Sequence, residues 1–250
     1  MQRYFLNENA EQHQRFFITD SKDIHHIKSV MRQTVGDELI INFIDAETYR
    51  CKIISIEPQQ MTIETVERLD LQTELPFNIT ICSGLIKGDK YEWLLQKATE
   101  LGATSFVTTQ MDRSVVKLNE QKAAKKVERW QKIVKEAAEQ SYRQVIPQVK
   151  FISNLHEIYD MISQYDCVLM AYEAAAKKNE RALFKQQLRQ LNRGSHVLLL
   201  FGPEGGFSDD EIALFENVAK SVGLGPRILR AETAPLYALS AISYEIELMG

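Results

Sequence analysis

The sharpest chemical feature of this sequence is a glycine-dense stretch that follows an apolar run. Residues 197–201 are typical of a buried strand, and residues 202–208 read Gly-Pro-Glu-Gly-Gly-Phe-Ser. Glycines permit positive φ and let a ligand contact the backbone. Because ligands bind at the carboxyl ends of strands in open α/β sheets, this position suits a cofactor loop. The stretch lacks the Gly-Lys-Ser/Thr of a phosphate loop and the Gly-x-Gly-x-x-Gly of a dinucleotide site.

Part of the same stretch has a structural interpretation. Ser208 followed by Glu211 matches a capping box, so we expect Ser208 to cap a helix and not to act as a nucleophile. The glycines are also common turn formers. From the residues alone, a ligand loop and a plain turn both stay open.

A second candidate loop covers residues 224–234 and carries Arg230 and Glu232. Charged side chains between a strand and a helix are well placed for function. The alternative is structural, with an ion pair between Arg230 and Glu232 and a helix cap at Thr233.

Metal and thiol chemistry have little support in the sequence. His25 and His26 are adjacent, but no cysteine or acidic cluster beside them has the spacing of metal ligands. The three cysteines are isolated among apolar residues, which favours reduced core thiols. We therefore predict no metal site.

Composition indicates a globular protein of the cytoplasm. The 250 residues are 44% hydrophobic, and the sequence has neither a signal peptide nor an apolar run long enough to span a membrane. A net charge of -4 argues against general binding of polyanions. Residues 113–150 nevertheless carry ten basic and four acidic residues. This strip is either a surface that binds nucleic acid or a solvated helix face.

Apolar periodicity changes along the chain. Short strands are expected at 38–43, 49–56 and 61–66, and alternating strands and helices follow residue 76. The later strands are predicted at 77–82, 104–109, 167–171, 197–201 and 227–229. The later helices are predicted at 89–101, 119–141, 155–164, 180–191, 209–222 and 235–249. The last helix is apolar on all sides, so we expect it in the core or in a subunit interface.

Several motifs together carry a resemblance that covers nearly the whole chain. They are the opening Met1-Gln2-Arg3-Tyr4-Phe5, His25-His26 with Arg32, Lys97-Ala98-Thr99-Glu100-Leu101-Gly102, Gly202-Pro203-Glu204-Gly205-Gly206-Phe207 and Leu229-Arg230-Ala231-Glu232-Thr233-Ala234. The chain resembles the bacterial 16S ribosomal RNA uridine-N3 methyltransferase family of the SPOUT superfamily. It departs from the family pattern at Tyr142, where glycine is expected, and at Ala231, where threonine is common.

The resemblance implies a fold, a cofactor and partners. It implies an α/β SPOUT methyltransferase domain with a trefoil knot at residues 73–250 and a small PUA-like β-barrel domain that binds RNA at residues 1–72. S-adenosylmethionine is the expected cofactor. The expected partners are 16S ribosomal RNA or the small ribosomal subunit, and a second copy of the chain through the C-terminal helix.

The resemblance and the loop positions also predict site residues. For the cofactor they are Phe201, Gly202, Pro203, Glu204, Gly205, Leu224, Gly225, Ile228, Leu229, Arg230, Thr233 and Ala234. Arg230 is predicted to stabilise the uridine anion, and Glu204 or Glu232 to take its N3 proton. The candidates for RNA contact are Arg3, His26, Arg32, Arg113, Lys125 and Arg143.

Two alternatives remain open at this point. Because a fold does not fix a substrate, the chain could methylate a different RNA. It could also be a noncatalytic protein that binds RNA during ribosome assembly. A nicotinamide-dependent oxidoreductase is disfavoured, because the dinucleotide fingerprint is missing.

Overall fold

The computed structural model describes residues 3–172 and 182–249, which group into two compact units. The first unit comprises residues 1–74 with 138–145, and the second comprises 75–137 with 146–250. The division at residues 72 and 73 stays a prediction. The sequence did not indicate that the short stretch 138–145 groups with the N-terminal residues.

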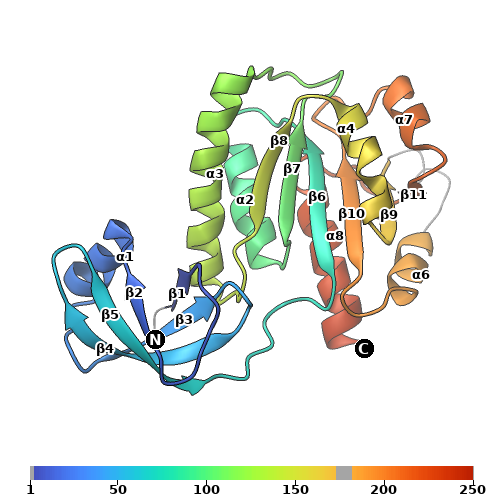
Figure 1. Ribbon diagram of the computed structural model, residues 1–250. Coiled ribbons are helices and arrows are strands. Elements are labelled where there is room, and N and C mark those ends of the chain that lie inside the picture. The colour runs from blue at the N-terminus through green and yellow to red at the C-terminus, as the bar shows by residue number, and fades with distance from the viewer. Residues whose placement is uncertain (1–2, 173–181, 250) are drawn as a thin grey trace. The chain divides into compact units, whose positions relative to one another are not determined.

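The first unit is built on a curled five-stranded sheet in the order β1-β3-β4-β5-β2 (Figure 1). The strands are β1 (Arg3–Leu6), β2 (Arg15–Ile18), β3 (Glu38–Phe43), β4 (Thr48–Ile56) and β5 (Met61–Arg68). The strands β3, β4 and β5 were predicted, whereas β1 and β2 were not. Alternate residues such as Leu39, Ile41 and Phe43 are buried, so one face of the sheet encloses its own core. The helix α1 (Ser21–His25) and the π-helical turn η1 (His26–Val30) complete the unit.

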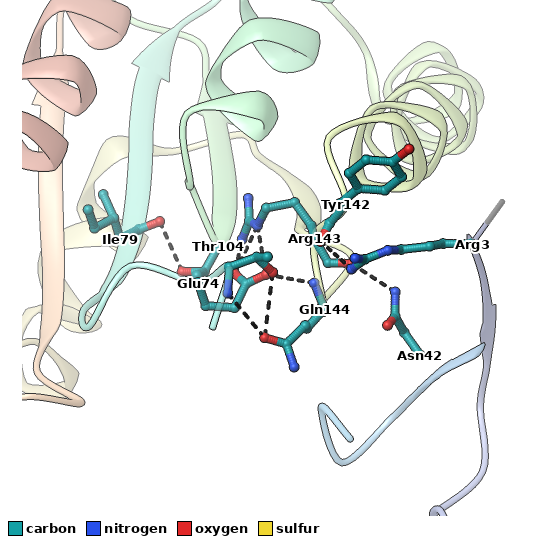
Figure 2. A network of polar contacts seen from close by, with 9 residues as sticks. Arg3, Asn42, Glu74, Ile79, Thr104, Tyr142, Arg143 and Gln144 are labelled. Atoms are coloured by element: carbon teal, nitrogen blue, oxygen red, sulfur yellow. Dashed lines mark hydrogen bonds and ion pairs between the residues drawn. The ribbon is translucent and has the colours of Figure 1, made fainter. Parts of the chain in front are cut away.

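A buried ion pair fixes the stretch 138–145 to this unit (Figure 2). The Arg143 guanidinium donates from Nε to both Glu74 carboxylate oxygens, at 2.9 and 2.8 Å. The Gln144 amide donates to the same carboxylate at 2.7 Å, and Asn42 donates to the Arg143 carbonyl at 2.8 Å. The Arg143 side chain is only 2% exposed. Removing one partner of such a buried pair typically costs about 3–5 kcal/mol, so this contact is structural.

The neighbouring Tyr142, which departs from the family pattern, adopts a backbone conformation that suits glycine. Its φ is 60°, a left-handed conformation that costs most residues about 1–2 kcal/mol and suits the glycine expected there. Arg3 donates to the Tyr142 carbonyl at 2.7 Å, and its guanidinium lies 4.6 Å from the centre of the Tyr142 ring. Such a cation–π contact contributes about 0.5–1 kcal/mol, which offsets part of the strain.

The second unit has a six-stranded parallel sheet in the order β11-β9-β10-β6-β7-β8. Its strands are β6 (Asn78–Gly84), β7 (Ser105–Thr109), β8 (Gln148–Ile152), β9 (Cys167–Ala171), β10 (His196–Phe201) and β11 (Lys220–Val222). Neighbouring residues of β10 point to opposite faces, with Leu199 in one core and Leu198 and Leu200 in the other. Burial on both faces is typical of a parallel sheet that helices cover.

Helices cover both faces of this sheet. They are α2 (Lys90–Glu100), α3 (Glu120–Gln140), α4 (Leu155–Asp160), α6 (Leu183–Arg189), α7 (Asp209–Phe215) and α8 (Ala234–Ser243). The core on one face includes residues of α2, α3, α6 and α8, and the core on the other includes residues of α4 and α7. The predicted arrangement of a parallel sheet between helices is therefore confirmed.

Some of the predicted elements are wrong in extent or type. The helix predicted at 209–222 ends at Phe215, and β11 follows at Lys220–Val222. No strand forms at 227–229. The helix predicted at 155–164 ends at Asp160 and continues as the 3-10 turn η2 (Ile162–Gln164), and α8 passes into the π-helical turn η3 (Tyr244–Leu248). The first residues of the helix predicted at 180–191 lie outside the described residues.

Two further observations concern both units. Cys51, Cys82 and Cys167 are buried free thiols, as predicted. Across residues 3–172 and 182–249, no helix combines the length and apolar character needed to cross a bilayer. The trefoil knot stays a prediction.

Candidate active site

The strand order of the second unit reverses between β6 and β10. From β6 the chain proceeds to its neighbour β7, whereas from β10 it proceeds to β11 on the opposite side of the sheet. At such a switch point the connections leave in opposite directions, so a crevice opens beyond the carboxyl ends of the two strands. The glycine stretch follows β10 at this point, and residues 85–89 follow β6.

A cavity of about 660 Å³ occupies this crevice. Its volume lies in the usual range of sites for small molecules and cofactors. The cavity is lined by Lys90, Arg113, Ala171, Tyr172, residues 201–207, Asp209, Val222, Leu224, Gly225, residues 227–232 and Ala234. The structure thus brings together all the predicted cofactor residues except Thr233, which lines an adjoining hollow.

Glycine backbone gives the cavity its shape. Gly206 has a φ of 71° and donates from its amide to the Pro203 carbonyl at 2.9 Å, which closes a tight turn. A Cβ atom on Gly202 would lie 2.9 Å from the carbonyl carbon of Gly206. Gly84, the last residue of β6, would bring a Cβ within 2.7 Å of the Pro203 ring. The loop can therefore pack against β6 only because these side chains are missing.

The predicted capping box is present, and its residues also bind Asp112. Ser208 accepts from the Glu211 amide at 3.2 Å, and Glu211 accepts from the Ser208 amide at 2.8 Å. Glu211 also accepts from the Asp112 amide at 2.8 Å, and the Ser208 hydroxyl donates to Asp112 at 2.6 Å. Ser208 is thus a cap with a structural role, as predicted.

Glu204 has a positioning role in this geometry. Its carboxylate accepts from the backbone amide of Lys87 at 2.9 Å. This hydrogen bond joins the loop after β10 to the loop after β6. One carboxylate oxygen of Glu204 is therefore engaged at the rim of the cavity.

Glu232 differs from Glu204 in its surroundings. Its side chain is 11% exposed, and Lys90 of α2 lies 3.1 Å from its Oε1 atom. The Oε2 atom is buried and accepts no hydrogen bond within the described residues. Burial acts to raise the pKa of Glu232, but a backbone hydrogen bond, the ammonium of Lys90 and the charge of Arg230 together hold its pKa below the ordinary value. Glu232 is therefore ionised at neutral pH and retains a free acceptor.

The structural alternative for this second loop is not what forms. The ion pair of Glu232 is with Lys90 and not with Arg230. Thr233 precedes α8, but its side chain makes no capping hydrogen bond. The Arg230 and Thr233 side chains are therefore not engaged in the ion pair and the helix cap that the structural alternative predicted.

The candidates for RNA contact divide by exposure. Arg32, Arg113 and Lys125 are exposed, and Arg113 also donates to the Gly205 carbonyl at 3.4 Å. His26 is partly exposed and shares a hydrogen bond with the Tyr4 hydroxyl at 2.9 Å. Arg3 and Arg143 have side chains buried in the polar network of the first unit, and their contact with RNA stays a prediction.

Sequence reasoning missed two residues of the site. Lys90 begins α2 and lines the cavity, but nothing in the local sequence separates it from any exposed lysine. Gly84 lies beyond the strand predicted at 77–82 and was given no role, although β6 extends to it. The available signal for both was the strand order, which places the end of β6 beside the end of β10.

Comparison with known families agrees with this architecture. Residues 73–243 match the RNA methyltransferase domain family, and residues 18–66 match the RNA methyltransferase PUA domain family. The predicted combination of an α/β methyltransferase domain with a PUA-like domain is therefore confirmed.

Individual relatives agree as well. The chain is 45% identical over 253 aligned residues to ribosomal RNA small subunit methyltransferase E of Bacillus subtilis, covering 100% of this chain and 98% of that protein. The crystal structure of a Neisseria gonorrhoeae ribosomal RNA small subunit methyltransferase E bound to S-adenosylmethionine matches with a TM-score of 0.82, 28% identity and 98% coverage of each chain. A methyltransferase of Legionella pneumophila in complex with the same cofactor matches with a TM-score of 0.79, 26% identity and 97% coverage of each chain.

Fold, cavity and domain matches define an RNA methyltransferase of the α/β type with an accessory PUA domain. Within that class, the chain belongs to the ribosomal RNA small subunit methyltransferase E family.

The packing of Gly84 against Pro203 leads to a testable prediction. Gly84→Ala should weaken the affinity for S-adenosylmethionine about tenfold or more, equivalent to about 1.4 kcal/mol, because the added methyl group displaces the loop after β10. Isothermal titration measures this affinity. Gln186→Ala is the control, since Gln186 is an exposed residue of α6 that does not line the cavity. Equal affinities for the two variants would contradict the role given to this contact.

Proposed function

We propose that this chain transfers a methyl group from S-adenosylmethionine to N3 of a uridine in the 16S ribosomal RNA of the small ribosomal subunit, in the cytoplasm. The observation that carries the proposal is the cavity at the β6 and β10 switch point. It is lined by the two loops expected to hold the cofactor, and Glu232 lies at its edge. The membership of the methyltransferase E family supports the choice of substrate.

The residues present fit the cofactor. Glycine backbone at 202 and 205 offers close approach to polar groups, while Phe201, Leu224 and Leu229 offer apolar contact for an adenine ring. S-adenosylmethionine would supply an electrophilic methyl carbon, whose bond to sulfur breaks as N3 forms its bond to that carbon.

The chain must supply removal of a proton. The neutral imide nitrogen of uridine is a poor nucleophile, so N3 needs a base within reach. Glu232 is ionised, partly desolvated and has a free Oε2 acceptor, whereas Glu204 is engaged with the Lys87 amide. We therefore assign proton acceptance to Glu232 and the orientation of the loop to Glu204. Arg230, at the cavity wall, stabilises the negative charge that develops on the uracil ring.

These roles predict different effects of two amide substitutions. Glu232→Gln should lower kcat by about 10²–10⁴-fold with little change in cofactor affinity, because the amide cannot accept the proton. Glu204→Gln should keep most of the activity, because its amide oxygen can still accept from Lys87. Transfer of a radioactive methyl group to unmethylated small ribosomal subunits measures kcat, and isothermal titration with S-adenosylmethionine measures binding.

The wild-type controls test the function itself. The protein should bind S-adenosylmethionine but not NADH, and should label 16S ribosomal RNA but not transfer RNA. Labelling of transfer RNA alone would support a different RNA substrate. Absence of cofactor binding would point to a noncatalytic RNA-binding protein.

RNA contacts are proposed for the exposed basic residues. Arg113 lies at the cavity, and Lys125 lies on α3 of the same unit. Arg32 and His26 belong to the first unit, which is the PUA-like unit. Lysine and arginine that neutralise phosphates release counterions, so binding weakens as salt increases.

The salt dependence of binding tests these contacts individually. Arg113→Gln and Lys125→Gln should each make the slope of log K against log salt concentration less negative by about 0.7–0.9. Fluorescence anisotropy with labelled 16S ribosomal RNA at several salt concentrations gives the slope. Lys185→Gln is a suitable control, because Lys185 is ion paired with Glu245 on the protein surface. Slopes equal to that of the wild type would remove these residues from the interface.

A homodimer through the C-terminal helix is also proposed. The α8 helix buries Ala238, Leu239 and Ile242 in the core. The same helix and η3 leave large apolar side chains exposed, namely Tyr237, Tyr244, Leu248 and Met249. An exposed apolar patch of this kind is typical of a protein interface.

Sedimentation equilibrium should give twice the mass of one chain for the wild-type protein. Replacing Leu248 and Met249 together with serine should shift the population towards single chains, because apolar area is removed from the interface. Val115→Ser, an equally exposed apolar position in a loop, should leave the mass unchanged. A wild-type protein that sediments as a single chain would refute the dimer.

A further inference from the structure

A second hollow of about 400 Å³ adjoins the cofactor cavity. It is lined by Asp89, Lys90, Trp93, Glu232 and Thr233. Lys90 and Glu232 line both spaces. Their ion pair, 3.1 Å long, is therefore the wall that the two spaces share.

The shared wall presents hydrogen-bonding groups that the protein does not use fully. Glu232 Oε2 is buried without a donor, and a buried acceptor that stays unsatisfied costs about 1–3 kcal/mol. The Lys90 ammonium has three N–H donors, and its side chain is 46% exposed. The wall can thus accept one N–H group and donate to a neighbouring oxygen.

Trp93 gives the hollow an aromatic surface. Trp93 lies one turn along α2 from Lys90, and 46% of it is exposed although it is a large apolar residue. Nucleobases stack on exposed aromatic side chains, and a base that reacts at its Watson–Crick edge must leave its own stack. A base that has left its stack therefore needs another aromatic surface on which to stack.

From this juxtaposition we infer that the hollow binds the target uracil, with its ring against Trp93, its N3–H donating to Glu232 and a flanking carbonyl accepting from Lys90. This inference rests on the proposed function. It assigns Trp93 and Lys90 to substrate recognition, and it places N3 beside Glu232, which also lines the cofactor cavity.

The arrangement also gives a chemical reason for selecting uracil. The N3 atom of uracil carries a proton between two carbonyl groups, whereas N3 of cytosine carries a lone pair. A carboxylate accepts a hydrogen bond from the N3–H of uracil, whereas it repels the lone pair on N3 of cytosine. Glu232 thus serves both in recognition and in proton removal.

Steady-state methylation of unmethylated small ribosomal subunits tests the stacking contact. Trp93→Leu should raise KM for the subunit about tenfold and leave the Kd for S-adenosylmethionine unchanged, whereas Trp93→Phe should stay close to the wild type. Tyr159→Leu, at a similarly exposed aromatic position on α4, is the control. An unchanged KM in Trp93→Leu overturns the inference. A raised KM accompanied by a lower molar mass also overturns it, because Trp93 would then be a contact between copies of the chain.

The pH dependence of kcat tests whether Lys90 also keeps Glu232 ionised. The charged groups that face Glu232 are Lys90 and Asp89 of α2 and Arg230 of its own loop. Lys90→Met removes an ammonium that lowers the pKa of Glu232, whereas the burial of Glu232 still acts to raise it. The pKa of Glu232 should therefore rise. Because only the carboxylate accepts the proton, the acid limb of the profile should move to higher pH, and Lys90→Arg should restore it. An acid limb that does not move overturns this role of Lys90.

These experiments separate the inference from the proposed function. If the wild-type protein binds the cofactor and methylates the subunit but the Trp93 and Lys90 variants behave like the wild type, only the inference fails. If the wild-type protein methylates no RNA, the proposed function fails first.

Discussion

The close packing of two strand ends is the constraint on which the candidate site depends. The strand β10 ends directly beside β6, and the loops that follow them leave in opposite directions. The loop after β10 can lie over Gly84 only because that residue has no side chain. Once this contact forms, the Glu204 carboxylate reaches the Lys87 amide, and Glu232 meets Lys90 at the start of α2. Three loops that are distant in sequence thereby form one cavity.

Much of the second unit could be predicted from local patterns. The alternation of strands and helices, the glycine loop and the cap at Ser208 depend on residues that are near one another in the sequence, and all were recognised. The strand at Lys220–Val222 was taken for the end of a helix because three residues are too few to display a period of two. Lys90 was missed for a different reason. Its role depends on a partner 142 positions later in the chain, which no local pattern reports.

The first unit shows how a charged residue can mislead. Arg143 lies in a basic stretch and was expected on the surface, yet its guanidinium is buried against Glu74. The net charge of a segment indicates which ligands it could attract, but only its exposed side chains can contact them. Tyr142 is the opposite case. Glycine is the residue expected at this position from the family pattern, and the φ of 60° shows why glycine suits it.

The grouping of residues 138–145 with the N-terminal residues has a consequence for how the chain is made. During synthesis the N-terminal residues leave the ribosome first, and domains generally fold in that order. Here Glu74 is translated long before Arg143, so its carboxylate stays without its partner until the end of α3 has emerged. The PUA-like unit therefore cannot reach its final polar network as an early, independent product. Its completion is coupled to synthesis of nearly half of the methyltransferase domain.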